Sequence, residues 1–539
     1  MKKKLVSTLS LLLAIVLLVG CGKSASKGEE STKEEESTKE VIRSEKGEDK
    51  EAPVELNVMI WDRGNAAPGT TAEDNTTSKF IQESVLEECN VKVNFVPVPR
   101  SGSNDKVNVM MAGGNAPDIV FSYSRNLFGD YAKKGGLTDL TSYVDEFGSQ
   151  LKETLGEEIL SIGVIGGKQY AIPAKRDTQK IRHAGYIRKD WVEALGKELP
   201  KSKQELIDIL YEFKEKDPGK VGDKLVSWAM GGNQDTEKYF LNFVGSYVDM
   251  SNEKDQYIYT ENIKAVHPSA KEGFKVMNKL YNDGIIKEDF PIDTNDDIYK
   301  QDITNGYAGF ILEDNMRPID QHWIEALVSN VPEAEFVAIN VLEDPNGKLI
   351  TPADPLHGMY IMVPSVSEKK AEAAIKYLNW LANTENSMKV MFTPDYTTDE
   401  NGVPIAISRD ELDEQGYAGT PNDFTIVTQY WSYSGNKDAL VSEWLSTYPF
   451  LSKEYFESFY DAVTSGLYTE PVLQEILESE TKYLANLDKL IIEFAYKSII
   501  ADPSNFEKTY EEEYNKLIQA GLQEILDERA AYYDNNVAK

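Results

Sequence analysis

An alternation of strand-like and helix-like segments near the start of the sequence constrains the fold most. The first segment alternates and then turns apolar, as a strand buried in a sheet does. Two further strand-like segments follow, each preceded by a helix-like one. The five segments are, in order, residues 56–61, 77–88, 91–98, 105–112 and 118–121. This order predicts a parallel or mixed sheet with helices on its faces.

The same pattern continues along the chain. Apolar residues on one face predict a helix over 203–214, and residues 359–363 are strand-like. A helix follows Pro364, for which we expect Ser365 or Ser367 to be the N-cap. From about residue 470 to 534 we expect helix, interrupted at 502–504. The chain is therefore α/β with a helical C-terminal region.

The N-terminus has the pattern of a secretion signal. Three lysines precede an apolar run from Leu5 to Val19, which is too short to be a comfortable membrane span. The run ends at Gly20-Cys21, which resembles a bacterial lipobox, so we expect cleavage after residue 20 and lipidation of Cys21. Residues 22–53 are polar and charged, which predicts a disordered tether. We expect a location on the outer face of the cell membrane, held by the lipid alone.

Composition excludes several classes of protein. The formal charge of −33, which becomes −36 without the three signal lysines, argues against nucleic-acid binding and against adhesion to anionic lipid. With Cys21 lipidated, Cys89 has no disulfide partner, and we expect it to be a small buried residue. About 490 residues follow the tether, which predicts two or three domains.

Motifs of common enzymes are absent from the sequence. The four histidines form neither an HExxH motif nor a zinc pattern with cysteine, and there is no Walker A loop, GxGxxG fingerprint or GxSxG elbow. We therefore expect no enzyme activity, no cofactor and no metal. A glycosidase needs only two carboxylates, so a secreted polysaccharide-active enzyme is the alternative.

Several motifs together resemble the extracellular solute-binding proteins of bacterial ABC importers, in the long branch that takes oligosaccharides. Residues 110–120, MMAGGNAPDIV, resemble the family signature AAGxxPD, and residues 131–140, YAKKGGLTDL, resemble a segment of its maltose-binding members. Residues 167–173, GKQYAIP, are similar to the strand at which the chain first crosses between domains. Residues 187–202, IRKDWVEALG…LPKS, and the region 487–506 resemble the long lipoprotein members.

The resemblance implies a periplasmic-binding-protein-like fold of type II, with two α/β domains, a hinge and a ligand cleft between them. It implies a first domain of residues 54–173 and about 357–425, and a second domain of 174–356 and about 426–539. It further implies a monomer that captures an oligosaccharide and delivers it to membrane permeases. The same fold could instead bind a peptide or another small solute.

One segment departs from the family pattern. Long members often carry a calcium-binding loop after a helix that ends in FKEKDP, and residues 213–218 have that sequence here. Only Asp217 and Asp223 remain as acidic ligands in the segment that follows, and two lysines have entered it. Calcium needs more oxygen ligands than these, so we expect no calcium at this loop.

Candidate ligand contacts are polar or aromatic residues that follow strands, because ligands of α/β sheets lie beyond the carboxyl ends of the strands. A sugar needs aromatic platforms and planar polar groups. The candidates by this rule are Trp61, Asp62, Arg63, Ser122, Tyr123, Arg125, Trp228, Asp314 and Asn315. Further candidates lie at the two crossovers and in a late loop: Lys175, Arg176 and Asp177 at the first crossover, His357 before a strand near the second, and Tyr430 and Trp431 in the loop.

Some of these residues have a second interpretation. Trp61 and Trp228 fit a core position as well as a sugar platform, and Arg63 and Arg176 can pair with their neighbours Asp62 and Asp177. Arginines that face the cleft would instead hint at an acidic sugar. We assign Trp380 to the core and Trp191 to packing or to the edge of the cleft.

Overall fold

The computed structural model describes residues 52–176, 178–232, 239–400, 402–405, 407–428, 437–473 and 475–538. Cys21, the tether, Asp177, Tyr430 and Trp431 lie outside these ranges. No helix in the described part of the chain combines the length and the apolar character that a membrane crossing requires.

The first domain is built on two sheets. Strand β1 (Val54–Asp62) pairs in parallel with β2 (Val91–Pro99), and β11 (His357–Met362) lies between β3 (Val120–Ser122) and β6 (Ala171–Lys175), antiparallel to both. A parallel bridge from Val58 to Ile119 connects β1 with the start of β3. The sequence therefore predicted the strands and the mixed sheet correctly.

Helices cover this sheet and close one hydrophobic core. They are α1 (Thr76–Cys89), α2 (Ser103–Gly113), α3 (Arg125–Lys133), α4 (Thr141–Phe147), α5 (Ser149–Ser161), α14 (Ala371–Ala382) and α15 (Thr384–Phe392). A small hairpin of β4 (Val164–Ile165) and β5 (Lys168–Gln169) and the helix α16 (Arg409–Glu414), which has no buried residue, complete the domain. The core includes apolar residues from Leu56 to Ala174 and from Met359 to Val427. Two separate stretches of sequence thus build one core.

Two local expectations for the first domain need correction. Neither Ser365 nor Ser367 caps α14, because a 3-10 helix fills 365–370 and the N-cap position is Lys370. Ser367 instead donates a hydrogen bond to Asp118 (2.7 Å). Cys89 is only half-buried, at the C-terminus of α1, and burial raises the pKa of its thiol. Trp380 does lie in the core, as expected.

The second domain has one mixed sheet in the order β10-β7-β9-β8. Strands β8 (Val226–Trp228) and β9 (Ala308–Asp314) are parallel, while β7 (His183–Arg188) is antiparallel to both β9 and β10 (Phe336–Ile339). Alternate residues of β7 enter different cores, Ile187 one and Tyr186 the other. Both faces of this sheet are therefore buried, which explains its almost uniformly apolar strands.

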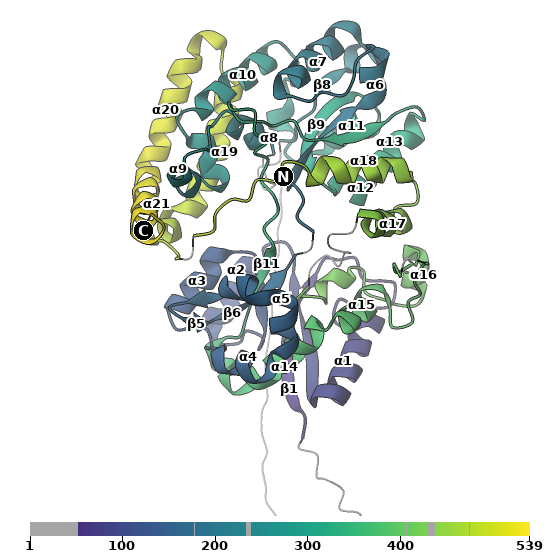
Figure 1. Cartoon of the computed structure of the whole chain (residues 1–539), viewed down its shortest axis with the longest axis vertical. Coiled ribbons are helices and arrows are strands. Elements are labelled where there is room, and N and C mark those ends of the chain that lie inside the picture. The colour runs from purple at the N-terminus through teal and green to yellow at the C-terminus, as the bar shows by residue number, and fades with distance from the viewer. Residues whose placement is uncertain are drawn as a thin grey trace, which may run out of the picture. The chain divides into compact units, whose positions relative to one another are not determined.

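Helices from distant parts of the sequence cover the two faces. One core contains residues of α6 (Lys189–Ala194), α7 (Lys203–Lys216), α8 (Phe240–Gly245), α9 (Glu253–Ile258), α10 (Ala270–Asn282), α19 (Ala485–Ile500), α20 (Phe506–Gln519) and α21 (Leu522–Asn536). The other contains residues of α11 (Asp297–Thr304), α12 (Arg317–Asp320), α13 (Trp323–Asn330), α17 (Lys437–Thr447) and α18 (Lys453–Thr464). In Figure 1 the yellow C-terminal helices lie beside α9 and α10.

The C-terminal region is helical over a shorter range than expected. Residues 471–473 and 475–477 are not helical, and regular α-helix begins at α19 after one π-helical turn over Glu480–Leu484. The break at 502–504 occurs as predicted, with the Asp502 side chain accepting a hydrogen bond from the Ser504 amide (2.8 Å). Trp191 is buried against Phe213 and therefore serves packing.

Two connections between the domains run side by side. The segment after β6 and the segment before β11 pair through an antiparallel bridge from Ile181 to Ala353. Backbone hydrogen bonds from Arg176 to Leu356 (2.7 Å) and from Asp354 to Lys180 (2.8 Å) extend this pairing. The connections therefore form a short ribbon, a geometry that suits a hinge.

Candidate functional site

Strand ends converge at one edge of the first domain. Strands β1 and β2 are in parallel register, with Asp62 opposite Pro99, so the residues that follow them, Arg63 and Arg100, lie at the same edge. Strands β3 and β6 both run antiparallel to β11, so their carboxyl ends and the amino end of β11 share an edge as well. The residues at this edge are therefore Arg63, Arg100, Tyr123, Arg176 and His357.

Aromatic and guanidinium groups pack together there. The rings of Trp61 and Tyr123 stack with centroids 5.7 Å apart, and the Arg100 guanidinium lies 4.2 Å from the Trp61 centroid. The guanidinium of Arg63 lies 5.5 Å from Trp61, and that of Arg176 lies 5.7 Å from Tyr123. We call these five residues, Trp61, Arg63, Arg100, Tyr123 and Arg176, the cationic cluster.

Two arginines of the cationic cluster have carboxylate partners from distant segments. Arg63 donates two hydrogen bonds to the buried Asp423 (2.6 and 2.8 Å), and Arg176 donates to Asp354 (2.7 Å). Arg63 therefore pairs with a distant aspartate, and not with its neighbour Asp62 as the alternative interpretation had it. Asp62 is exposed and accepts a hydrogen bond from the Gly64 amide (2.9 Å).

His357 borders the cluster from the start of β11. Burial lowers the pKa of its imidazole to about 4, and the positive charges of Arg176 and Arg125 act in the same direction. The imidazole is therefore neutral at neutral pH, and its ring lies 5.9 Å from that of Tyr360.

Four other candidates of the first domain make structural contacts. The buried Ser122 donates a hydrogen bond to Asn104 (2.7 Å) and accepts one from the Ser124 amide (2.9 Å). Lys175 donates to the carbonyl of Thr154 (2.8 Å). Trp61 is only 4% exposed and Arg100 lies over its ring, so it presents no open face to a sugar.

The fourth, Arg125, contacts the segment that precedes α19. It donates hydrogen bonds to the carbonyls of Leu473 and Glu475 and lies 3.5 Å from the Glu480 carboxylate. Glu480 is buried and pairs with the equally buried Arg529 of α21 (2.9 Å). Arg125 therefore ties α3 of the first domain to the C-terminal region.

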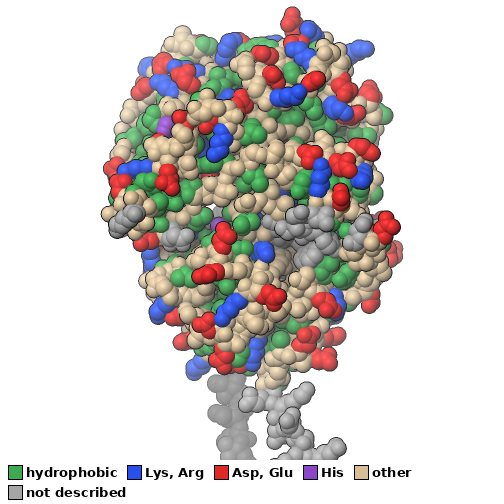
Figure 2. Space-filling view, in the orientation of Figure 1, with side chains coloured by type: hydrophobic (Ala, Val, Ile, Leu, Met, Phe, Trp, Pro, Cys, Tyr) green, Lys and Arg blue, Asp and Glu red, His purple; other side chains and the backbone are tan. Residues whose placement is uncertain are grey.

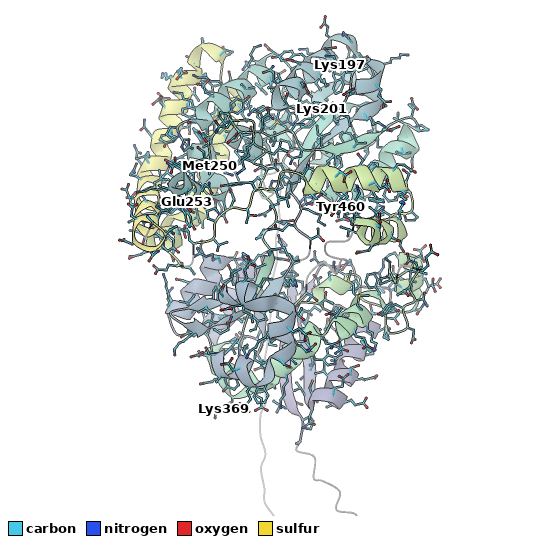
Figure 3. All side chains as sticks on the ribbon, in the orientation of Figure 1. Lys197, Lys201, Met250, Glu253, Lys369 and Tyr460 are labelled. Atoms are coloured by element: carbon cyan, nitrogen blue, oxygen red, sulfur yellow. The ribbon has the colours of Figure 1, made fainter. Side chains whose placement is uncertain are left out.

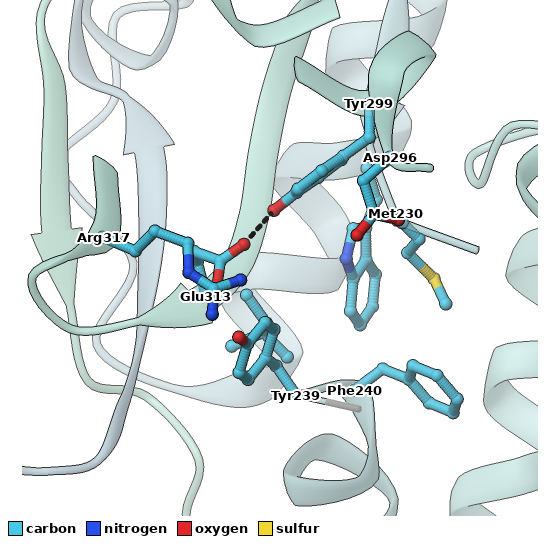
Figure 4. Close-up of a pocket in the computed structure, with 10 residues that line it drawn as sticks. Met230, Tyr239, Phe240, Asp296, Tyr299, Glu313 and Arg317 are labelled. Carbon is cyan, nitrogen blue, oxygen red and sulfur yellow. Dashed lines mark hydrogen bonds and ion pairs between the residues drawn. The ribbon is translucent and has the colours of Figure 1, made fainter. Parts of the chain in front are cut away.

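A second set of strand ends forms a small pocket in the second domain (Figure 4). The pocket lies where the parallel strands β8 and β9 end, with a cavity volume of about 30 Å³, which is room for no more than a few water molecules. It is lined by Trp228, Met230, Gly231, Tyr239, Phe240, Asp296, Tyr299, Leu312, Glu313 and Arg317.

Glu313 is the central polar group of this pocket. Its carboxylate accepts hydrogen bonds from the Tyr299 hydroxyl (3.0 Å) and the Asp314 amide (2.9 Å), and Arg317 lies 3.3 Å from it. Figure 4 shows the Tyr299 hydroxyl directed at this carboxylate. Burial raises the pKa of Glu313, while Arg317 and these hydrogen bonds act in the opposite direction. We call Glu313, Tyr299, Tyr239 and Arg317 the Glu313 cluster.

The candidates predicted in the second domain mostly make structural contacts next to this pocket. Trp228 is fully buried between Phe243 and Phe310 and belongs to the core, so its assignment as a sugar platform needs correction. Asn315 is buried and donates a hydrogen bond to the Ile181 carbonyl (2.6 Å). This bond holds the crossover segment before β7 against the end of β9. The Asp314 carboxylate accepts a hydrogen bond from the Met316 amide (3.1 Å).

Sequence reasoning missed several polar residues of both clusters. Arg100 follows β2 directly, so the strand-end rule that selected Arg63 selects Arg100 too. Glu313 immediately precedes the selected Asp314, and only the pleat of β9 decides which of the two faces the pocket. Asp423 and Asp354 lie in segments without strand character and carried no such signal.

Other surfaces are weaker candidates for a ligand site. A hollow beside α7, near Lys197 and Lys201 (Figure 3), is lined by exposed side chains in local ion pairs such as Lys201–Glu198 (2.7 Å). On the face seen in Figure 2, acidic and basic side chains are interspersed. Across the described ranges, no three His, Cys, Asp or Glu side chains are arranged to hold a metal ion.

In the segment that departs from the calcium-loop pattern, backbone amides bind the carboxylate of Asp217. The two carboxylate oxygens of Asp217 accept hydrogen bonds from the amides of Val221 (3.0 Å) and Gly222 (2.8 Å). The absence of calcium at this loop stays a prediction, which a calorimetric titration of the metal-stripped protein with calcium would test.

Solved structures with a similar fold support this architecture. The chain superposes on the alginate-binding protein AlgQ2, solved without calcium ion, with a TM-score of 0.64 at 18% identity, covering 90% of this chain and 98% of that one. At this identity the likeness shows the fold alone, which is the two-domain type II fold of periplasmic binding proteins, with a hinge between α/β domains.

Sequence relatives are more similar over shorter spans. Lipoprotein LipO of Bacillus subtilis is 26% identical over 332 residues, 59% of this chain and 63% of LipO. The fructooligosaccharide ABC transporter substrate-binding protein FusA of Streptococcus pneumoniae is 26% identical over 245 residues, 41% of this chain and 44% of FusA. The chain thus spans less than two thirds of the curated relatives it matches.

The family model for bacterial extracellular solute-binding proteins matches residues 68–388, which is more than half of the chain. This range begins just after β1 and ends within α15, so it includes the crossover ribbon and the strand ends of both clusters except those of β1. The chain therefore belongs to the family of bacterial extracellular solute-binding proteins.

Proposed function

We propose that this protein is the substrate-binding component of an ABC importer, which captures an oligosaccharide between its two domains and delivers it to membrane permeases. The names of two similar proteins support the ligand class, since FusA is named for fructooligosaccharide and AlgQ2 for alginate. We further propose that the protein acts without catalysis and as a monomer.

The observation that carries the proposal is where the two clusters lie relative to the crossover ribbon. The chain leaves the first domain at the carboxyl end of β6, the edge that holds the cationic cluster. It enters the second domain at the start of β7, the edge where β8 and β9 end beside the Glu313 cluster. Both strand-end edges therefore adjoin the hinge, where a closing cleft would bury a ligand.

The chemistry of these edges suits a sugar. Aromatic rings and planar groups such as guanidinium and carboxylate recognise sugar faces and hydroxyls. The described residues supply Tyr123, Arg100, Arg176 and Asp354 at one edge and Tyr239 and Asp296 at the other. We keep Tyr430 and Trp431 as proposed contacts from the late loop, and Asp177 as one from the crossover.

The N-terminal pattern adds an anchor to the proposal. A diacylglycerol on Cys21, followed by the tether, would hold the binding domains on the outer face of the cell membrane, near the permeases. Mass spectrometry of the protein from cells should show the lipid on Cys21, and a Cys21→Ser variant should be released into the medium.

The experiment that tests the function is a ligand screen. Neutral and acidic oligosaccharides, amino acids and short peptides are titrated into the lipid-free protein by thermal shift and calorimetry. A true ligand at a hundredfold excess over its Kd should add about 2.7 kcal/mol of stability. Binding of peptides or amino acids alone, or the appearance of cleaved sugar in the calorimeter cell, would overturn the proposal.

A further inference from the structure

The cationic cluster has more guanidinium groups than carboxylates to pair with them. Arg63 pairs with Asp423 and Arg176 pairs with Asp354. Within the part of the chain that the structure describes, no carboxylate lies within 4.0 Å of the Arg100 guanidinium. Asp62, which lies opposite Pro99 at the end of the neighbouring strand, instead accepts a hydrogen bond from the Gly64 amide. The cluster therefore carries one positive charge in excess of its paired groups.

Arg100 is held in a geometry that prepares it for an anion. Its guanidinium lies 4.2 Å from the ring centroid of Trp61 and 5.7 Å from that of Tyr123, and the residue is only partly exposed. A guanidinium that stacks on an aromatic ring uses its flat face, so its N–H donors stay in the plane and can grip two oxygens at once. The two aromatic contacts thus restrain the Arg100 guanidinium before any ligand arrives.

Several N–H groups of the cluster also lack acceptors. The Nε atoms of Arg100 and Arg176 and the Nε1 atom of Trp61 are buried, and none has a hydrogen-bond partner among the described residues. Buried donors are normally paired, because leaving them unpaired is costly. The two arginine Nε atoms are therefore donors that no described residue of the domain satisfies.

The surroundings make this excess of positive charge significant. The chain has a formal net charge of −33, so its overall field repels anions. His357, which faces the cluster from β11, is neutral at neutral pH and adds no further charge. A neutral sugar would gain little from an unpaired, partly desolvated guanidinium, whereas a carboxylate would gain a bidentate, charge-assisted hydrogen bond.

We propose that the cationic cluster binds the carboxylate of an acidic oligosaccharide, a chain containing uronic acid units, with Arg100 as the residue that selects the acid. This inference rests on the proposed function and narrows its ligand class. Arg100 donates two of its in-plane N–H groups to the carboxylate, and Tyr123 and Arg176 border the sugar ring that bears it. The carboxylate neutralises the excess charge of the cluster.

The test compares ligands that differ only in charge. The lipid-free protein is titrated by calorimetry with trigalacturonate, with its methyl ester, with trimannuronate, and with neutral galacto-, fructo- and xylo-trisaccharides. We expect binding of at least one uronate trimer. Binding of the methyl ester should be at least tenfold weaker than binding of the free acid, and the free-acid affinity should fall with added salt.

Variants then assign the site. Arg100→Gln should weaken binding of the uronate trimer by about tenfold to a hundredfold, the range for a hydrogen bond to a charged group. Arg100→Lys keeps the charge without the fork and should lose less. Arg409→Gln, which removes an arginine from the exposed pair with Asp413 in α16, is the matched control and should leave the affinity unchanged. Circular dichroism checks that each variant folds.

The outcomes separate the inference from the proposed function. Binding of neutral trisaccharides with no binding of any uronate trimer overturns the acidic ligand but leaves an oligosaccharide-binding protein. Uronate binding that Arg100→Gln and Arg100→Lys both leave intact overturns the role of Arg100. A screen in which no sugar binds overturns both proposals.

Discussion

The two strand-end clusters differ in how their charged groups are paired. The Glu313 cluster buries a carboxylate and supplies its donors from within the second domain, through Tyr299, Arg317 and a backbone amide. The cationic cluster gathers three guanidinium groups for two carboxylates and leaves buried N–H groups without acceptors among the described residues. The comparison indicates that one cluster is complete without a ligand, whereas the other is completed by one.

The largest effect on stability should come from removing the central carboxylate of the Glu313 cluster. Glu313 is 1% exposed, so Glu313→Ala leaves the Tyr299 hydroxyl and the Arg317 guanidinium without their shared partner. Breaking a buried pair from one side costs about 3–5 kcal/mol, and the partial exposure of Arg317 places the expected loss at about 3 kcal/mol. Urea unfolding followed by tryptophan fluorescence measures the loss.

Glu335→Ala is the control for this substitution. Glu335 pairs with Lys189 at 2.5 Å, but both side chains are largely exposed, so the loss should stay below about 1 kcal/mol. If Glu313→Ala cost no more than this control, the Glu313 cluster would not be the self-contained group that the comparison requires.

A comparable effect should appear as a pH dependence beside the cationic cluster. Burial and two arginines lower the pKa of His357 to about 4 in the folded protein, from 6.5. The unfolded chain therefore binds this proton more tightly than the folded one. The stabilising contribution is fully present above pH 6.5 and is lost as the pH falls toward 4, by ~3 kcal/mol in total.

Thermal unfolding between pH 4 and 7 tests this window. A His357→Gln variant should show a flatter dependence of stability on pH across it, while His322→Gln, which changes an exposed histidine paired with Glu325, should follow the parent protein. Equal slopes for the parent and His357→Gln would show that burial and the neighbouring arginines do not lower the pKa of His357 in the folded protein.

The smallest effect should come from unpairing Arg63. Asp423→Asn weakens two hydrogen bonds to a guanidinium that is partly exposed, so we expect a loss of about 1–2 kcal/mol in unfolding free energy. It also adds to the positive excess of the cluster, so affinity for a uronate trimer should rise or hold while stability falls. Asp413→Asn, in an exposed helical pair, should change neither quantity measurably. If Asp423→Asn lowered both the uronate affinity and the stability, Asp423 would hold the cluster in position instead of balancing its charge.

Sequence periodicity predicted the architecture because both domains repeat one local rule. Strands such as 91–98 alternate and helices such as 203–214 have one apolar face, and the structure places β2 and α7 there. The strand-end rule likewise brought Arg63 and Tyr123 to one edge, and the crossover positions brought Arg176 and His357 to the same edge. It depends only on strand direction, which the order of elements determines.

The parts that could not be predicted depend on tertiary packing. Trp61 and Trp228 look like sugar platforms because they end strands, yet Trp61 is buried beneath Arg100 and Trp228 between Phe243 and Phe310. The partners of Arg63 and Arg176 are 360 and 178 residues away, so no local pattern indicates them. The serines after Pro364 are good caps by type, but a 3-10 helix moves the start of α14 beyond them.

The position of β11 in its sheet sets the order in which the molecule can assemble. Strands β3 and β6 are not neighbours; β11 lies between them and is the last of the three to be synthesised, after all four strands of the second domain. The gap between β3 and β6 therefore stays unfilled until β11 has been synthesised, which happens only after the strands of the second domain. Such distant pairing slows folding and exposes unpaired edges meanwhile, so substitutions in β11 should reduce the yield of native protein more than they reduce its final stability.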